Sequence, residues 1–282
     1  MPASRLLTGL SAAIAALFVS LPAIGDPLPN PPEHYFGDNG YCALILERSR
    51  LHETLIEVGA EQCQQALSPF STFKIPNALI GLQTGVLTGP GDTKVWDGKT
   101  RQREISNRDH TLASAINKSI VWYFQQVARD VGEARMAHWL ELLDYGNRDI
   151  SGGIDQFWLG SSLKINAHGQ LGLLKDLWHG TLPFKPEYQQ YTRDMLVLES
   201  DLNGVLHGKT GGCQGGTEQN PVDHGWFIGW VDWNEPRRQD PYVTFFVVNI
   251  TDNKKRGQAA KQAALEILRD LHPTALSQQT TE

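Results

Sequence analysis

The placement of strand-like and helix-like segments along the chain limits the fold more than any other feature. Strand-like runs lie near both ends, with "YCALILE" and "ETLIEV" before residue 60 and "GVLHGKTGG", "GWFIGWVD" and "YVTFFVVNI" after residue 200. Between about residues 75 and 145, apolar residues recur at helical spacings of three and four, and "GQAAKQAALEILRDL" predicts a C-terminal helix. The pattern predicts an α+β fold. Its mainly antiparallel sheet combines N- and C-terminal strands, flanked by terminal helices, beside an all-helical lobe of about residues 77–190.

The N-terminus has the order of charge, apolar run and small residues that is typical of a secretory signal. Arg5 precedes an apolar run that ends at Leu21, and Ala23 and Gly25 are the small residues. The run is short and contains polar residues, which favours cleavage after Gly25 over an uncleaved membrane anchor. We therefore expect a periplasmic protein without stable membrane association, and a single domain over residues 26–282. Monomer and homodimer both remain open.

Two further segments carry secondary expectations. The stretch "PLPNPP" after the signal predicts an extended leader without core residues, so the fold should begin near Tyr41. Residues 148–181, rich in Gly and Ser, predict an irregular connection with short helices, and its length suggests a functional loop.

Charge and metal-ligand spacing exclude two classes of function. The formal net charge is -6 and no block of Lys and Arg occurs, which argues against a nucleic-acid partner. The nine histidines show no His-Glu-x-x-His spacing, so no metal cofactor is expected.

The three cysteines, Cys42, Cys63 and Cys213, leave at least one thiol free. Cys42 and Cys63 flank the first strand pair. A disulfide between them and two unpaired thiols are equal alternatives, while Cys213 is interpreted as a small apolar strand residue.

A serine and a lysine stand three residues apart in "STFK", from Ser71 to Lys74, at the start of the first helical segment. A base at this spacing shares the helix face of the serine and can take its proton. The spacing alone is weak evidence, because "SSLK" from Ser161 to Lys164 repeats it. An ordinary N-cap at Ser71, with Lys74 in solvent, is the alternative. The apolar neighbours of Lys74 favour a neutral amine, which is able to act as a base.

Further motifs follow in a fixed order: "SIV" from Ser119 to Val121, "YGN", "FWL", "KTG" from Lys209 to Gly211, and "GWFIGWV". Ser-x-x-Lys and Lys-Thr-Gly occur together in serine β-lactamases and penicillin-binding proteins. With Ser-Ile-Val as the middle element, the chain resembles the class D β-lactamases, the oxacillinase family. The resemblance covers nearly the whole chain after the signal. It implies a penicillin-binding transpeptidase-like fold and an enzyme that hydrolyses penicillins and related β-lactam substrates.

The resemblance also implies a role for each motif residue. Ser71 looks like the nucleophile that forms the acyl-enzyme, and Lys74 like the lysine that takes up carbon dioxide to become an N-carboxylated base. No other cofactor is implied. Ser119 would relay a proton, with Lys209 supplying positive charge beside it. The pocket around the carboxylated lysine would be formed by Val121, Trp158 and Leu159, and the substrate would be held by Thr210, Gly211 and Gly212, with an oxyanion hole from the N–H groups of Ser71 and Gly212.

The cation for the substrate carboxylate is the point where the chain departs from the family pattern. The family has an arginine at the start of the C-terminal helix. Counting without gaps gives Lys261, whereas the nearest arginine is Arg256, which we prefer on the assumption of a shortened loop. A solvated helix face remains the alternative for both residues.

Two other functions use the same serine and lysine. One is a β-lactam sensor or penicillin-binding module that is acylated at Ser71 but turns over slowly. The other is a peptidase that cleaves D-alanyl-D-alanine peptides.

Overall fold

The computed structural model describes residues 23–24, 28–212, 223–234 and 242–273. In this part of the chain a seven-stranded sheet has the order β1 (Ala23–Ile24), β3 (Glu53–Val58), β2 (Tyr41–Arg48), β9 (Val243–Thr251), β8 (His224–Trp233), β7 (Gly204–Gly212) and β6 (Val197–Leu198). All neighbours are antiparallel except β1 and β3. A small second sheet pairs β4 (Thr93–Lys94) with β5 (His110–Thr111). Apart from β1, the predicted signal peptide lies outside the described residues.

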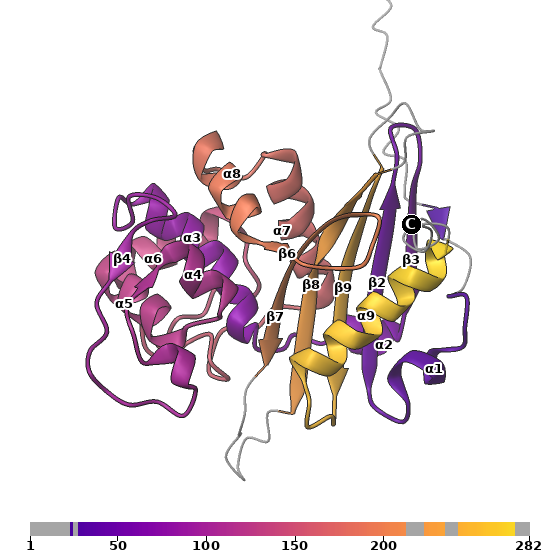
Figure 1. Cartoon of the computed structure of the whole chain (residues 1–282), viewed down its shortest axis with the longest axis horizontal. Coiled ribbons are helices and arrows are strands. Elements are labelled where there is room, and N and C mark those ends of the chain that lie inside the picture. Colours follow the sequence, from indigo (N-terminus) through magenta and orange to yellow (C-terminus); the bar gives the residue numbers. More distant parts are fainter. Residues whose placement is uncertain (1–22, 25–27, 213–222, 235–241, 274–282) are drawn as a thin grey trace, which may run out of the picture.

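The predicted sheet from both ends of the chain is confirmed. The N-terminal strand β2 pairs with the C-terminal strand β9 over eight residues, from Tyr41 opposite Ile250 to Arg48 opposite Val243. Because this pairing joins residues about 200 positions apart, it closes the two ends of the chain into one sheet (Figure 1).

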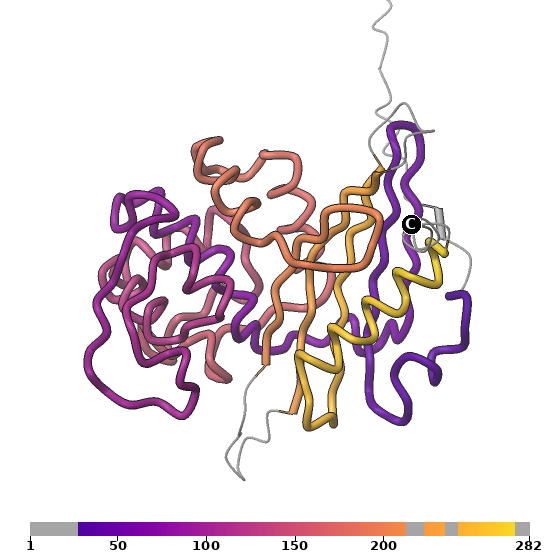
Figure 2. Tube along the Cα trace, viewed as in Figure 1, coloured from indigo at the N-terminus to yellow at the C-terminus, as the bar shows by residue number. Residues whose placement is uncertain are grey.

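Side chains of alternate residues enter two separate cores, one on each face of the sheet, as the period of a strand requires. On β9, Val243, Phe245 and Val247 face the core shared with the helical lobe, and Phe246, Val248 and Ile250 face the opposite core. The C-terminal helix α9 (Gly257–Leu271) and the short α1 (Pro32–Phe36) cover this second face. They lie close together in the fold (Figure 2). Asn30 and Tyr35 each donate a hydrogen bond to Asp270 on α9 at 2.8 Å.

The other helices and the two 3-10 turns form the helical lobe or connect it to the sheet. Their bounds are α2 (Ala60–Gln64), η1 (Phe70–Phe73), α3 (Lys74–Gln83), η2 (Glu104–Ser106), α4 (Leu112–Asn117), α5 (Val121–Val131), α6 (Glu133–Leu142), α7 (Ala167–His179) and α8 (Pro186–Met195). Helix α3 is buried from Lys74 to Leu82, so it is the central helix of the lobe. No described helix has the length and apolarity needed to span a bilayer.

Two expectations about irregular segments are wrong. The leader before Tyr41 does contribute to the core, since Leu28, Tyr35 and Phe36 are buried beneath α9. The connection after residue 148 stays irregular only to Asn166, whose side chain accepts a hydrogen bond from the N–H of Gly169 at 2.9 Å and caps α7. A helix was expected in this segment, but α7, with 13 residues, is longer than the short helices predicted, because its two glycines weaken the helical pattern.

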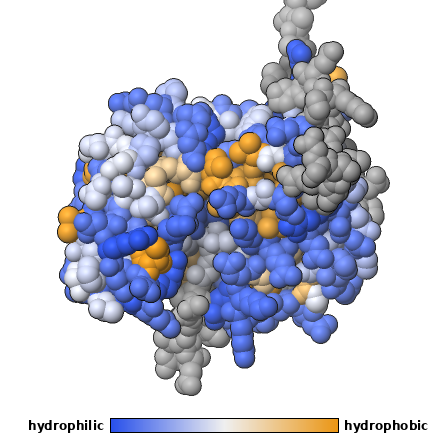
Figure 3. Space-filling model, in the orientation of Figure 1, coloured by the Kyte–Doolittle hydropathy of each residue, from blue (hydrophilic) through white to orange (hydrophobic). Residues whose placement is uncertain are grey.

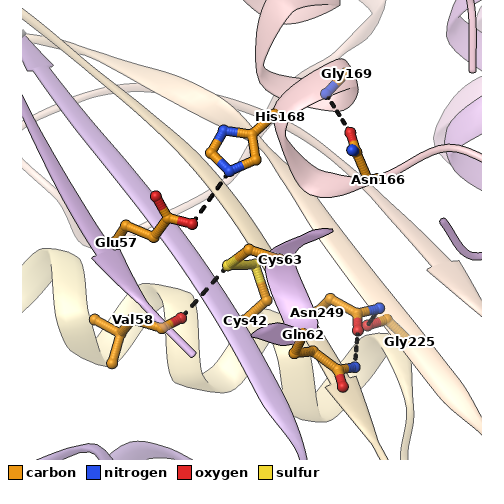
Figure 4. Close-up of a disulfide and its surroundings, with 10 residues drawn as sticks. All are labelled: Cys42, Glu57, Val58, Gln62, Cys63, Asn166, His168, Gly169, Gly225 and Asn249. Carbon is orange, nitrogen blue, oxygen red and sulfur yellow. Dashed lines mark hydrogen bonds and ion pairs between the residues drawn. A yellow bond between two sulfur atoms is a disulfide. The ribbon is translucent and has the colours of Figure 1, made fainter. Parts of the chain in front are cut away.

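The structure contains a disulfide between Cys42 and Cys63, which decides the question that the sequence left open. It joins β2 to α2, and Cys63 Sγ also contacts the carbonyl of Val58 (Figure 4). Next to it, Gln62 donates a hydrogen bond to Asn249 on β9 at 2.8 Å, so α2 is fixed to the sheet at two points. Cys213 lies outside the described residues.

Removing this disulfide should destabilise the fold. The two cysteines are 21 residues apart, and closing a loop of that length in the unfolded chain is worth about 3 kcal/mol in the chain-entropy model. We expect Cys42→Ser/Cys63→Ser to lower the free energy of unfolding by about that amount in urea titrations. Cys213→Ser is the matched control, and equal stability of the double variant and this control would contradict the expectation.

Candidate active site

The predicted serine and lysine lie at the junction of η1 and α3. Lys74 Nζ donates a hydrogen bond to Ser71 Oγ at 2.8 Å. The second pair with the same spacing, Ser161 and Lys164, has no such bond, although the structure describes both residues. The structure therefore distinguishes two serine–lysine pairs that look alike in the sequence.

Lys74 is buried because it begins the central helix of the lobe. Its side chain is fully enclosed, and Nζ lies 5.6 Å from the centre of the Phe124 ring. Burial, followed by the positive charges of Lys209 and Arg103, holds the pKa of Lys74 well below 10.5. At neutral pH the amine is thus driven toward its uncharged form, and the Ser71 hydroxyl can then donate to its lone pair.

Trp158 brings an unpaired hydrogen-bond donor into this region. Its ring stacks on Phe73, with the centroids 5.3 Å apart, and packs edge-on against Phe157 at 4.8 Å. The indole Nε1 is buried and has no acceptor. An unsatisfied buried donor costs about 1–3 kcal/mol, so its retention needs an explanation.

The other two predicted pocket residues are less enclosed than Trp158. Leu159 is partly buried against the core of the helical lobe. Val121 begins α5 and is 37% exposed. Val121 therefore lies at the surface, whereas Lys74 is fully enclosed.

Ser119 lies between α4 and α5, two residues before α5 begins. Its backbone has a positive φ of 56°, an uncommon conformation for a residue with a side chain. Ser119 Oγ accepts a hydrogen bond from Lys209 Nζ at 3.0 Å, across the boundary between the lobe and the sheet. Phe70, directly before Ser71, also has a positive φ, of 47°. Backbone strain of this kind clusters at functional sites.

Lys209 is the second buried amine of the cluster. Burial, together with the positive charge of Arg103, lowers the pKa of Lys209 to about 7. The amine can thus exchange a proton with Ser119 near neutral pH. The catalytic candidates Ser71, Lys74, Ser119 and Lys209 all lie within one cluster, linked in two hydrogen-bonded pairs.

The end of β7 passes close to the nucleophile. A Cβ on Gly211 would lie 2.7 Å from the carbonyl oxygen of Pro69 and 3.0 Å from the side chain of Thr72, so only glycine fits here. Gly212 has a φ of 152°. Within the described residues β6 pairs only with Leu206 and His207, which leaves the edge of β7 beyond them without a strand partner. In Figure 3 an apolar patch lies over β6 and β7, where Val197 and Val205 are exposed.

The two candidate cations occupy different places. Arg256 lies beside Gly212 and forms an ion pair with Asp223 at 2.8 Å, while its Nε is buried without a partner. Lys261 lines a cavity of about 170 Å³ that also includes Lys209 and Thr210. Both are therefore near β7, Arg256 at its end and Lys261 farther back along it.

Arg103 is a further residue of the site, and no sequence motif points to it. Its guanidinium donates hydrogen bonds to the carbonyl oxygens of Lys118 at 2.8 Å and Ser119 at 3.3 Å. Its charge acts on both buried amines. It belongs to no motif, and its place at the site depends on the path of the loop before η2. Within the described residues, no group of three or more His, Cys, Asp or Glu side chains could hold a metal.

Comparisons with known proteins agree with this geometry. The family model of the penicillin-binding protein transpeptidase domain matches residues 39–271. The chain is 43% identical over 209 residues to "Probable beta-lactamase YbxI" of Bacillus subtilis (strain 168), covering 74% of this chain and 73% of that protein. It is 42% identical over 201 residues to beta-lactamase OXA-10 of Pseudomonas aeruginosa, covering 71% and 73%. The solved structure of the class D beta-lactamase BAT-2 superposes with a TM-score of 0.75 at 36% identity, covering 85% of this chain and 94% of that one.

Proposed function

Because the chain belongs to the class D β-lactamase family, we propose that it is a periplasmic serine hydrolase that opens the β-lactam ring of penicillins and related compounds. The reaction would proceed through an ester on Ser71, with N-carboxylated Lys74 as the general base. The observation that carries this proposal is the buried amine of Lys74, 2.8 Å from the Ser71 hydroxyl, where burial holds its pKa well below the usual value.

Carboxylation of Lys74 fits the residues present. The reaction with carbon dioxide requires a free amine, which the lowered pKa of Lys74 provides. The carboxylate formed on Nζ would accept a hydrogen bond from the indole N–H of Trp158, which has no acceptor otherwise. When present, this group supplies a base that can take a proton from a hydroxyl or a water. Phe73 holds the indole in place by stacking on it.

In the first step the Ser71 hydroxyl loses its proton to the base on Lys74, and its oxygen attacks the lactam carbonyl. The N–H groups of Ser71 and Gly212 would hold the oxyanion, which such donors stabilise by about 3–4 kcal/mol. The carbon–nitrogen bond then breaks, and the leaving nitrogen receives a proton from Ser119. Lys209, 3.0 Å from the Ser119 oxygen, replaces that proton or stabilises the oxygen that lost it.

In the second step water attacks the ester on Ser71 and gives up a proton to the same base. The ester carbon–oxygen bond breaks, and Ser71 regains its hydroxyl. Carboxylated Lys74 would thus serve as the base in both steps.

We assign the substrate carboxylate to Thr210 and Arg256 rather than to Lys261. Arg256 lies beside Gly212, at the same end of β7 as η1, and its guanidinium retains an unpaired buried N–H. A planar guanidinium can bind a carboxylate through two parallel hydrogen bonds, which a lysine cannot.

Arg256→Ala should therefore raise KM for benzylpenicillin by about tenfold, which corresponds to the loss of one charge-assisted contact. Lys261→Ala serves as the matched control and should change KM by less than about twofold. Steady-state kinetics of the two variants, with circular dichroism to verify folding, decide the assignment. A larger effect of Lys261→Ala would reverse it.

Hydrolysis of a penicillin and a cephalosporin panel, with bicarbonate added and removed, tests the function itself. We expect continuous turnover that bicarbonate increases. A single stoichiometric burst followed by a stable acyl-protein would instead support the sensor or penicillin-binding function, and release of D-alanine from a D-alanyl-D-alanine peptide would support a peptidase.

A further inference from the structure

Arg103 lies directly beside Ser119, one of the catalytic candidates. Its two hydrogen bonds fix the guanidinium on the carbonyls of Lys118 and Ser119, and the hydroxyl of the same Ser119 contacts Lys209. The Arg103 guanidinium therefore lies within about 10 Å of the Lys209 amine, measured through Ser119. This distance is close to the Debye length at physiological salt.

In the described part of the chain, the charge of Arg103 is not neutralised. The side chain is exposed, and the hydrogen bonds that it donates there go to backbone carbonyl oxygens. No carboxylate of a described residue lies within ion-pair distance of it. By contrast, Arg101, two residues earlier, pairs with Asp97 at 2.8 Å. A guanidinium has five N–H donors, so Arg103 retains several of them for a ligand.

The surroundings of Arg103 strengthen its attraction for anions. Lys118, which is exposed, contributes a second positive charge next to the carbonyls that Arg103 contacts. The protein as a whole carries a formal net charge of -6. A local excess of positive charge on an otherwise negative molecule concentrates anionic ligands at that place.

We propose that Arg103 forms an anion subsite at the rim of the active site, which selects β-lactams that carry a second carboxylate in the acylamino side chain. This inference rests on the proposed function. The carboxylate of the β-lactam ring system is assigned to Arg256, beside Gly212, three residues beyond Lys209 on β7. Lys209 and Gly212 are three residues apart on β7, about 10 Å at 3.3 Å per strand residue, so the two arginines reach the site beside different residues. A substrate with two carboxylates can engage each of them.

Carbenicillin and benzylpenicillin test this subsite, because they differ by one carboxylate in the side chain. In wild-type protein the ratio of the second-order acylation rate constants, carbenicillin to benzylpenicillin, should fall as salt increases. In Arg103→Gln at low salt this ratio should drop about fivefold and lose most of its salt dependence. Taking the ratio cancels any effect of the substitution on the two lysines, which both substrates share.

Two further variants separate charge from structure. Arg101→Gln removes the same charge two residues away but from an existing ion pair, so it should leave the ratio unchanged. Arg103→Lys keeps the positive charge but not the paired hydrogen bonds to the two carbonyls. The carbenicillin-to-benzylpenicillin ratio of this variant should therefore lie between those of wild type and Arg103→Gln. Thermal unfolding verifies that each variant is folded.

The outcomes are distinct for this inference and for the proposed function. If Arg103→Gln slows both substrates equally, or if Arg101→Gln has the same effect on the ratio, the subsite is wrong while the enzyme function stands. If wild-type protein is acylated by neither penicillin, the proposed function fails and the subsite fails with it. Because acylation is measured rather than turnover, a protein that deacylates slowly still gives a decisive ratio.

Discussion

Replacing Ser71 with alanine is expected to lower kcat for benzylpenicillin by at least about 10⁴-fold and to abolish the covalent adduct. The substitution removes one oxygen, the atom that lies 2.8 Å from Lys74 Nζ and forms the ester. Without it the remaining groups can bind the lactam but cannot divide its hydrolysis into two steps. Absorbance of the opening ring measures turnover, and intact-protein mass spectrometry after exposure to a fluorescent penicillin measures the adduct.

Ser161→Ala is the matched control for this experiment. Ser161 begins the second Ser-x-x-Lys of the chain, but no hydrogen bond joins it to Lys164. Its replacement should leave both turnover and labelling unchanged. Residual labelling of Ser71→Ala, or a comparable loss in Ser161→Ala, would show that the nucleophile has been assigned to the wrong serine.

The union of N- and C-terminal strands in one sheet could be predicted because strands leave a strong pattern. The runs at 41–47 and 242–250 are nearly continuous apolar segments, as expected for strands covered on both faces. Helix α7 could not be predicted as readily. Its glycines and its polar cap at Asn166 resemble the irregular stretch before it, and only its packing against the sheet stabilises the helix.

Some residues of the candidate site could likewise be predicted from the sequence, and others could not. Ser71, Lys74 and Lys209 were found because the chemistry requires these residue types at fixed spacings, and the spacing survives in the sequence. The burial of Lys74 was partly predictable from its apolar neighbours, but Phe124, which lies against its amine, is 50 residues away. Arg103 could not be found at all, because its contacts with two backbone carbonyls depend on a loop and on no side-chain pattern.

The second large effect is expected at Trp158. Trp158→Phe retains an aromatic ring that can stack on Phe73 but removes the indole N–H. If that N–H holds a carboxylate on Lys74, its loss should lower kcat about 10–100-fold, the usual effect of removing a group that supports a catalytic ligand. Activity should recover as bicarbonate is increased, and ¹³C NMR with labelled bicarbonate should show a weaker carbamate signal than in wild-type protein.

Trp139→Phe provides the control for the loss of an indole elsewhere. Trp139 lies on α6 and stacks on Phe184 with ring centroids 4.9 Å apart, in the helical lobe. Its replacement should affect stability slightly and leave the bicarbonate dependence as in wild type. Equal bicarbonate dependence in wild type and Trp158→Phe would mean that the indole does not hold the carboxylate.

The pH dependence follows from the same group, and its sign can be stated. Burial lowers the pKa of Lys74, so the free amine persists from high pH down to that lowered pKa and is protonated below it. A protonated amine cannot hold carbon dioxide. Activity should therefore be lost as the pH falls, and bicarbonate should restore it near neutral pH but not in acid.

Lys209, with a pKa of about 7, titrates in the same range. Bicarbonate distinguishes the titration of Lys74 from that of Lys209, because it restores only the activity that is lost by protonation of Lys74. If activity does not depend on bicarbonate at any pH and no carbamate signal is detected, the base is the unmodified amine of Lys74.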